Sequence, residues 1–152
     1  MTEDRGSKTK TICIKLIYNL KSMITMKRHF KFEKLTVWKN AMLLGEEIHN
    51  LSNVFPSNES YNLTQQIRRA ADSVALNISE GSIRQSDPEQ VKFIGYAVRS
   101  LAETVTCLHK ARLRTYISRE YFETSYVNCY NLMNSLIAFQ NAVRKAKDSK
   151  NI

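Results

Sequence analysis

Residues 63–81 read LTQQIRRAADSVALNISEG, and this stretch decides how the rest of the chain is interpreted. Its apolar side chains recur at intervals of three and four, which is the spacing of one face of an amphipathic helix. They are Leu63, Ile67, Ala70, Ala71, Val74 and Ile78. Gly81 supplies the left-handed position on which helices commonly stop, so the pattern predicts a helix from Leu63 to Gly81.

A row of polar side chains runs beside this apolar stripe. Ser73, Asn77 and Glu80 stand at i, i+4 and i+7, among small residues that let another helix come close. Such an approach would partly desolvate Asn77 and Glu80, and buried polar groups need hydrogen-bonding partners. We therefore expect this row to lie where two helices meet.

The partners that the polar row requires are predicted on the next helical segment. Ser100 and Glu103 are in reach by pattern, and Arg69 or Arg99 is the natural counter-charge for Glu80. A carboxylate left without a partner there would be costly. The row could also be an active cluster, but we favour the structural interpretation. The polar motif as a whole is Gln66, Ser73, Asn77, Glu80, Gly81, Ser100 and Glu103.

Three further helices follow from the same spacing. The chain of 152 residues is 43% hydrophobic and holds only 4 Gly and 2 Pro, which leaves little material for turns. The predicted helices are Thr36–Asn53, Pro88–Arg114 and Ser118–Lys147. Four long helices with short connections are typical of an all-α, antiparallel up-down-up-down four-helix bundle. No internal repeat indicates a solenoid.

The helix ends carry ordinary start signals. Thr36 is a candidate N-cap, and Asp87-Pro88 reads as an N-cap followed by proline in the first turn. Ser118 opens the last helix in the same way. Asn62 is a candidate for either a left-handed or an N-cap conformation, because asparagine tolerates both.

The chain is divided into two parts by composition. Residues 1–25 form a polar start and then an apolar segment interrupted by Lys15 and Lys21, and we interpret them as a peripheral N-terminal extension. A short helix docked on the outside is the alternative to an upstream extension. Residues 26–152 form the bundle domain. No window approaches the length of apolar sequence that a membrane span requires, and no signal peptide is evident.

The cysteines indicate a reduced environment. Cys13, Cys107 and Cys129 show neither CxxC spacing nor an even-numbered disulfide framework. Cys107 and Cys129 fall on apolar helix faces, where a free cysteine behaves as a small hydrophobic residue. We expect a cytoplasmic protein.

Catalytic and metal-binding patterns are missing from the sequence. The three histidines, His29, His49 and His109, lie on separate elements, and the Glu-x-x-His spacing of di-iron bundles occurs once, at Glu46 and His49. No phosphate-binding glycine loop or nucleophile elbow is present. We therefore predict no enzyme activity, no metal and no cofactor.

Charge favours a polyanionic partner. The formal charge is +9, of which residues 26–152 carry +6. A basic and aromatic cluster surrounds the connection between the third and fourth predicted helices: Arg112, Arg114 and Arg119 with Tyr116 and Tyr121. Such a cluster suits phosphate contact and base stacking. Arginine near the carboxyl end of a helix is equally natural, because it complements the helix dipole. The candidate nucleic-acid-binding residues are Arg68, Arg69, Arg84, Lys92, Arg99, Arg112, Arg114 and Arg119.

Several stretches resemble one known family. They are FEKLTVW (32–38), FP (55–56), YNLTQQIRRAADSVALNISEG (61–81) and AVRSLAET (97–104). Together they are similar to the four-helix-bundle proteins encoded by intervening sequences within 23S ribosomal RNA genes, and to the accessory protein of diversity-generating retroelements. Asn62 stands where the family commonly has glycine, and asparagine tolerates that turn.

The resemblance implies a bundle that assembles into a ring, typically a pentamer, with a basic surface. We therefore expect a non-enzymatic homo-oligomer that binds structured RNA, such as ribosomal RNA, or other nucleic acid. The alternative is a protein-interaction scaffold that serves as the accessory subunit of a retroelement reverse transcriptase. In an oligomer, the same few cations would repeat around the assembly.

Overall fold

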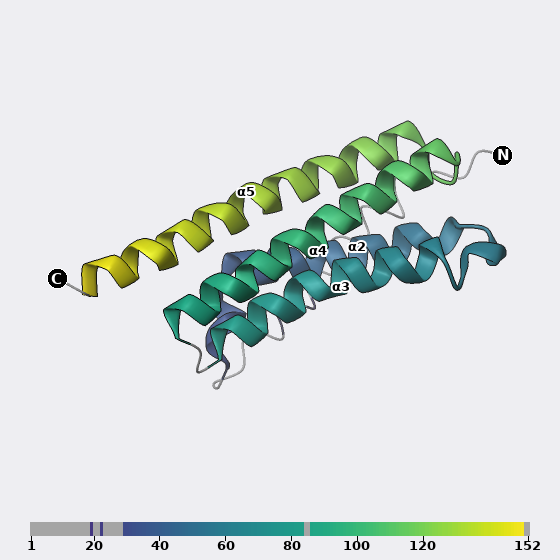
Figure 1. The fold of residues 1–152 in the computed structure, drawn as a ribbon. Helices are drawn as coiled ribbons and strands as arrows, with labels where there is room; N and C mark the ends of the chain where they lie inside the picture. Colours follow the sequence, from purple (N-terminus) through teal and green to yellow (C-terminus); the bar gives the residue numbers. More distant parts are fainter. Residues whose placement is uncertain (1–18, 20–21, 23–28, 84–85, 151–152) are drawn as a thin grey trace.

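The computed structural model describes residues 19, 22, 29–83 and 86–150, and within these residues it holds helices and no strands. The four long helices are α2 (Thr36–Leu51), α3 (Leu63–Ser82), α4 (Asp87–Leu113) and α5 (Arg119–Lys150) (Figure 1). Short 3-10 turns precede α2 and join it to α3: η1 (Lys31–Lys34), η2 (Ser52–Val54) and η3 (Ser57–Glu59). The prediction of an all-α four-helix bundle is confirmed.

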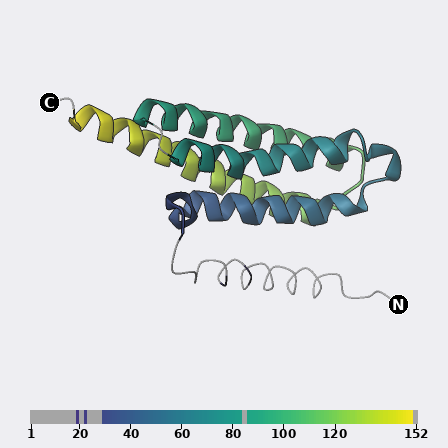
Figure 2. The ribbon, with the colours of Figure 1, turned by 90° about the horizontal axis from the view of Figure 1, so that it is seen from below.

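Consecutive long helices run antiparallel along their shared faces (Figure 2). Gly81 at the end of α3 lies against Phe93 near the start of α4, whereas Gln66 near the start of α3 reaches Glu103 far along α4. The pairing of α4 with α5 is fixed in the same way by two contacts, Val91 with Gln140 and His109 with Phe122. The C-terminal part of α5 continues past the other helices.

The core is built from the apolar stripes that the sequence predicts. Its largest fully buried side chains include Ile48, Ile67, Leu101 and Leu136. Burial of such aliphatic side chains supplies the main driving force for folding. Trp38, the single tryptophan, is also buried, and its ring packs 5.3 Å from that of Phe32.

Cys107 and Cys129 are free and buried in this core, as the apolar pattern predicts. Burial raises the pKa of the Cys129 thiol to about 12, with a further contribution from the Glu47 charge. A thiol with so high a pKa is a poor nucleophile at neutral pH. Cys13 lies outside the described residues.

The role predicted for Gly81 is wrong. No described glycine has a positive φ, and α3 continues through Gly81 to Ser82. Gly81 is needed for a different reason: a Cβ atom at this position would stand 2.7 Å from the Cβ of Phe93. Glycine therefore sets how closely α3 and α4 approach each other.

Three of the four predicted helix N-caps are wrong, and the fourth is confirmed. Leu35 and Ser86, neither with a side-chain cap, precede α2 and α4, so the predicted caps Thr36 and Asp87 are the first helical residues. The Ser118 hydroxyl accepts the Tyr121 amide at 3.2 Å, which agrees with its predicted role. Asn62 precedes α3 with φ −125°, so it is not left-handed, and its side chain does not cap the helix.

One left-handed residue ends α4. Thr115 has φ 58°, the only positive φ of a non-glycine residue within the described ranges. The Tyr116 amide donates to the Ala111 carbonyl and the Thr115 amide to the Arg112 carbonyl, which is the Schellman arrangement. Glycine usually occupies this position, because a β-branched residue is strained there.

The predicted boundary between residues 25 and 26 lies outside the residues that the structure describes, and so does nearly all of the predicted extension, residues 1–25. Within the described ranges, no helix combines the length and the apolar character that crossing a membrane requires.

Candidate functional site

A carboxylate buried at one end of the bundle collects four hydrogen bonds. Glu59 is 7% exposed, and its Oε1 accepts the Tyr116 hydroxyl at 2.8 Å and the Arg114 guanidinium at 2.9 Å. Its Oε2 accepts the Asn62 side-chain amide at 2.8 Å and the Leu63 backbone amide at 3.3 Å. Glu59 therefore caps α3 and ties it to the turn between α4 and α5.

The surroundings of Glu59 favour its charged form. The Tyr116 hydrogen bond, supported by the Leu63 amide and the Arg114 charge, holds the pKa of Glu59 below its ordinary value, although burial alone would raise it. The same hydrogen bond raises the pKa of Tyr116, because the hydroxyl proton is held by the carboxylate. The cluster is thus an internal ion pair with its hydrogen bonds satisfied.

This cluster changes the interpretation of the predicted arginine group at the α4–α5 turn. Arg114 and Tyr116 are engaged by Glu59. Arg119 lies 2.6 Å from Glu123, one turn along α5, in an exposed pair. Two of the three arginines predicted at this turn for nucleic-acid contact therefore have intramolecular partners, and Arg112, which is half-buried, is the third.

Arg68 also has a structural partner. Its Nε donates to the Ser52 hydroxyl at 2.6 Å, and its Nη2 donates to the Asn53 side chain at 2.9 Å and to the His49 carbonyl at 3.4 Å. These acceptors lie at the carboxyl end of α2, where carbonyl groups lack helical partners. The guanidinium closes that helix end and joins it to α3.

The polar row on α3 is less buried than the sequence suggests. Asn77 is half-buried, and its side chain donates at 2.7 Å to the Ser73 carbonyl of its own helix. Glu80 is exposed, and among the described residues no ion pair joins it to Arg69 or Arg99. The prediction that Glu80 is desolvated between two helices is wrong, because the row lies at the rim of the α3–α4 contact.

The predicted bonds from Ser73, Asn77 and Glu80 to Ser100 and Glu103 are not among the described contacts, but two members of the motif do meet between the helices. The Gln66 side chain donates to Glu103 at 3.4 Å, and both residues are exposed. Ser100 is half-buried, and its carbonyl accepts the Thr104 hydroxyl within α4. The contact between α3 and α4 is held mainly by apolar packing, with Gln66 and Glu103 bridging its surface.

A second row, on α4, joins two cations to an aromatic ring. Lys92, Tyr96 and Arg99 stand at i, i+4 and i+7, with the Lys92 Nζ and the Arg99 Cζ each 5.8 Å from the centre of the Tyr96 ring. Phe93 meets the same ring edge-on, with centroids 5.8 Å apart. Lys92 and Arg99 are exposed and Tyr96 is half-buried, so the ring is fixed while the charges face solvent.

Arg69 belongs to the same side of the molecule. It is exposed on α3, one turn from Gln66, and Gln66 bonds to Glu103, one turn from Arg99. The antiparallel register thus brings Arg69 to the level of Arg99. We name Arg69, Lys92, Tyr96 and Arg99 the α3–α4 cationic row. Arg84, the remaining candidate, lies outside the described residues.

The structure also shows polar contacts between distant elements that the sequence did not indicate. The Glu59 cluster joins residues 55 and 57 positions apart, and no local pattern identifies it. Glu47 of α2 likewise accepts Ser125 at 2.6 Å and Asn128 at 2.8 Å from α5. The Lys92–Tyr96–Arg99 spacing could be recognised in the sequence, because i, i+4 and i+7 positions share a helix face.

Within the described part of the chain, no group of three or more His, Cys, Asp or Glu side chains could hold a metal ion.

Comparison with known proteins agrees with this fold. A model of the family described as 23S rRNA-intervening sequence protein matches residues 33–138, more than half of the chain. A solved structure, described as a protein with unknown function from the S23 ribosomal protein family of Bacteroides thetaiotaomicron, has a TM-score of 0.64 at 24% identity; the match covers 69% of this chain and 98% of that one. That likeness concerns the fold. A search of curated proteins found no match.

Proposed function

Because the chain belongs to the family of 23S rRNA-intervening sequence proteins, we propose that it is a non-enzymatic, homo-oligomeric protein that binds structured RNA or other nucleic acid. The α3–α4 cationic row is the surface that we assign to this role. Ribosomal RNA is the first ligand to test, given the family. The ring of five chains that the resemblance implies would present the row several times.

The observation that carries the proposal is the placement of Lys92 and Arg99 over the Tyr96 ring. Proteins that bind unpaired nucleotides combine cations, which contact phosphates, with aromatic or guanidinium planes, on which bases stack. The row offers both features within about two turns of one helix. A contact with two neighbouring phosphates would need only rotations of the two exposed side chains.

Three of the other predicted cations have partners within the molecule, which supports this choice of surface. Arg68 and Arg114 are held by hydrogen bonds inside the bundle, and Arg119 is paired with Glu123. A cation already paired with a carboxylate gains less from a phosphate, because it must give up its first partner. Lys92 and Arg99 have only the Tyr96 ring beside them among the described contacts.

The test is a salt titration of the purified chain with fluorescently labelled fragments of 23S ribosomal RNA that contain unpaired loops. Each phosphate contact adds about one to the slope of log K against log salt concentration. We expect the double substitution Lys92→Gln/Arg99→Gln to reduce that slope by about two. Binding that is absent at low salt, or that does not weaken as salt rises, contradicts the proposal.

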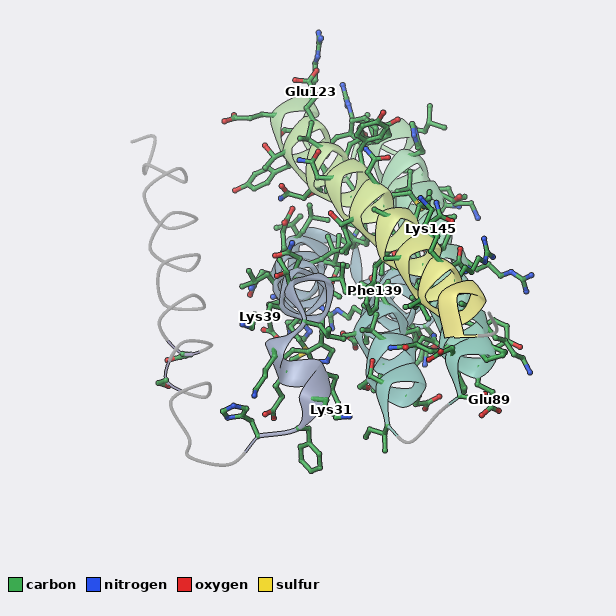
Figure 3. The ribbon with its side chains drawn as sticks, turned by 90° about the vertical axis from the view of Figure 1, so that its left-hand side faces the viewer. Lys31, Lys39, Glu89, Glu123, Phe139 and Lys145 are labelled. Carbon is green, nitrogen blue, oxygen red and sulfur yellow. The ribbon has the colours of Figure 1, made fainter. Side chains whose placement is uncertain are left out.

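A matched variant separates this surface from total charge. Lys31 and Lys34 are exposed on η1, and Figure 3 shows Lys31 on the α2 side of the bundle, away from Glu89 at the start of α4. Lys31→Gln/Lys34→Gln removes the same two charges and should leave the slope nearly unchanged. An equal reduction of the salt slope in both double variants would mean that total charge governs binding, without a defined surface.

The role as a reverse transcriptase accessory subunit stays a prediction. Gene neighbourhood distinguishes this role from RNA binding. A neighbouring reverse transcriptase gene with variable repeats favours the accessory role, whereas a ribosomal operon favours RNA binding. Co-purification with a reverse transcriptase without nucleic acid would support the accessory role.

A further inference from the structure

A two-sided pattern occupies residues 11–25, which read TICIKLIYNLKSMIT and which we name the amphipathic segment. At about 100° per residue, most of its large apolar side chains fall within about 140° of a helical wheel. They are Ile12, Leu16, Ile17, Leu20, Met23 and Ile24. The polar residues occupy the rest of the wheel, together with Ile14 and Tyr18. The sequence of this segment therefore predicts a helix with one apolar side.

Two residues of the amphipathic segment are described, and both agree with this prediction. Asn19 and Ser22 are helical and exposed, and the Ser22 hydroxyl donates at 2.9 Å to the Asn19 carbonyl one turn earlier. On the wheel both lie outside the apolar side, and Ser22 stands about opposite Cys13, which lies within it. The polar side thus faces solvent at the two described positions.

Positive charge is concentrated around the same segment. Residues 5–32 contain no Asp or Glu and carry a formal charge of +8. Glu3 and Asp4 subtract two charges, so residues 33–152, which include everything that the family model matches, carry +3 of the total +9. An apolar helix side bordered by Lys and Arg is typical of helices that lie on anionic membrane surfaces.

The structure describes the turn that follows this segment. Phe30 is 64% exposed, with its ring stacked 5.5 Å from that of Phe32, and its amide donates to the Glu33 carboxylate at 3.0 Å. Lys31 and Lys34 on η1 are exposed, and Figure 3 shows Lys31 at the outer edge of the bundle. An anchored turn therefore presents an aromatic ring and two cations, a combination suited to the headgroup region of a bilayer.

We propose that the amphipathic segment binds the surface of an anionic lipid bilayer and so attaches the bundle to a membrane. Its apolar side enters the boundary of the acyl chains, and its Lys and Arg residues contact the anionic headgroups. Fifteen helical residues extend about 22 Å, which is shorter than the hydrocarbon core of about 30 Å. Lys15 and Lys21 also interrupt the apolar sequence, so the segment lies on the bilayer and does not cross it.

The combination of features favours a bilayer over the other surfaces that could bind this segment. A nucleic acid would attract the cations but gives six large apolar side chains nothing to pack against. The chain's own bundle could cover the apolar side, but residues 33–152 carry the same sign of charge as the segment. Only an anionic bilayer matches both the charge and the apolar side.

The test is co-sedimentation of the full-length chain, without nucleic acid, with lipid vesicles. We expect binding to vesicles of phosphatidylcholine mixed with phosphatidylserine, weaker binding to phosphatidylcholine alone, and a decrease as salt rises. Leu16→Asn/Leu20→Asn should lower the partition coefficient on mixed vesicles at least about tenfold, because two leucines leave the acyl region.

A matched variant keeps the change in polarity and moves it to the other side of the helix. Ile14→Asn/Tyr18→Asn has the same spacing and the same unchanged charge, and it should alter the partition coefficient by less than about threefold. Absence of binding to mixed vesicles overturns the proposal. So does an equal loss in both double variants, or a loss in neither, because binding would then not depend on the apolar side.

A fluorescent probe tests the orientation directly. Cys107 and Cys129 are buried, so an environment-sensitive fluorophore can be attached at Cys13, on the apolar side. We expect its emission to shift to the blue when mixed vesicles are added. Cys13→Ser/Ser22→Cys moves the probe to the exposed polar side, where the shift should be small. Equal shifts at both positions, or a shift at neither, overturn the proposal.

Docking of the segment on its own bundle gives a different result. In that case Leu16→Asn/Leu20→Asn would lower the thermal midpoint, and vesicles would change neither sedimentation nor probe emission, which overturns the proposal. Under the proposal, the thermal midpoint without vesicles stays close to that of the wild type. Helical content is measured alongside, so that a folding defect is recognised.

The outcome is separable from that of RNA binding. Lys92→Gln/Arg99→Gln leaves the amphipathic segment intact and should bind mixed vesicles as the wild type does. Leu16→Asn/Leu20→Asn leaves the α3–α4 cationic row intact and should keep the wild-type salt slope with RNA. If the cationic-row variant lost vesicle binding as fully as the leucine variant, the bundle surface would be the membrane contact, and the proposal would be overturned.

Discussion

The Glu59 cluster and the α3–α4 cationic row are built from the same residue types and behave in opposite ways. Around Glu59, Arg114 and Tyr116 turn inward to a buried carboxylate. On α4, Lys92 and Arg99 lie over Tyr96 with their charges in solvent. The difference lies in the acid: where a buried carboxylate accepts their hydrogen bonds, arginine and tyrosine hold the fold, and where no described ion pair joins them to a carboxylate, they stay available to a ligand. Arginine beside tyrosine in a sequence therefore has two meanings, and the buried acid decides between them.

The largest effect is expected from Glu59→Gln, which keeps the shape of the side chain and removes its charge. The substitution weakens the bonds from Arg114 and Tyr116 and the cap on α3. At pH 7 we expect the thermal midpoint to fall by roughly 10 °C. Glu123→Gln, in an exposed pair with Arg119, is the control and should change the midpoint by far less.

The same variant should remove part of the pH dependence of stability. The pKa of Glu59 is lowered in the folded state, so its contribution is present above the unfolded value of about 4.3 and is lost as the pH falls through the folded value. Thermal melts between pH 3 and 7 should show the wild-type and Glu59→Gln midpoints converging on the acid side. A difference that is constant with pH would mean that the carboxylate charge is not what stabilises this end.

The next effect concerns the glycines of the α3–α4 and α4–α5 contacts. Gly81→Ala places a Cβ 2.7 Å from the Phe93 Cβ, an atom fixed to the backbone, so the helices must separate. We expect a loss of about 1–3 kcal/mol in the free energy of unfolding. Gly95→Ala meets the end of the Gln140 side chain at 3.3 Å, so that amide must shift by a few tenths of an ångström while it keeps its 2.9 Å bond to the Val91 carbonyl. Because alanine favours helix, we expect the net change to be close to zero. Urea titration of both variants checks the sign, and a destabilised Gly95→Ala of equal size would contradict the account.

Helix positions followed from the sequence, because each apolar stripe extends over many residues and errors in single positions average out. Predicted and observed bounds differ by one or two residues in α3 and α4: Leu63–Gly81 against Leu63–Ser82, and Pro88–Arg114 against Asp87–Leu113. The burial of Cys107 and Cys129 followed from the same periodicity.

The polar contacts could not be predicted in this way, because they depend on how closely neighbouring helices approach. Asn77 and Glu80 lie at the edge of a stripe, where a small rotation decides between burial and solvent. Glu59 lies in a short turn, and its partners come from a distant loop. For Gly81, the sequence correctly marked an exceptional position, but local conformation and close packing both select glycine, and only the structure distinguishes them.

A smaller effect is expected at the turn that presents Arg114 and Tyr116 to Glu59. Thr115 is left-handed, which costs a residue with a Cβ roughly 1–2 kcal/mol. Thr115→Gly removes that strain, and after the greater unfolded-state freedom of glycine is counted, a gain of about 1 kcal/mol in the free energy of unfolding is expected. Thr115→Ala is the control, because it removes the hydroxyl but keeps the Cβ. A loss of stability in the glycine variant would show that the turn tolerates threonine without strain.

The smallest effect on stability is expected from Lys92→Gln/Arg99→Gln, and its smallness is what makes it informative. Both side chains are exposed, and exposed substitutions usually change the free energy of unfolding by less than about 0.5 kcal/mol. Both cation–π contacts with Tyr96 are 5.8 Å long, close to the limit of about 6 Å, so each should add no more than about 0.5 kcal/mol at this exposed site. Denaturant titration should therefore give this variant nearly the same free energy of unfolding as the wild type. Glu59→Gln, which lies far from the row, should bind RNA normally at temperatures where it is folded. If the row variant lost as much stability as Glu59→Gln, the cations would be holding the fold as Arg114 does, and a loss of RNA binding could no longer be attributed to the surface.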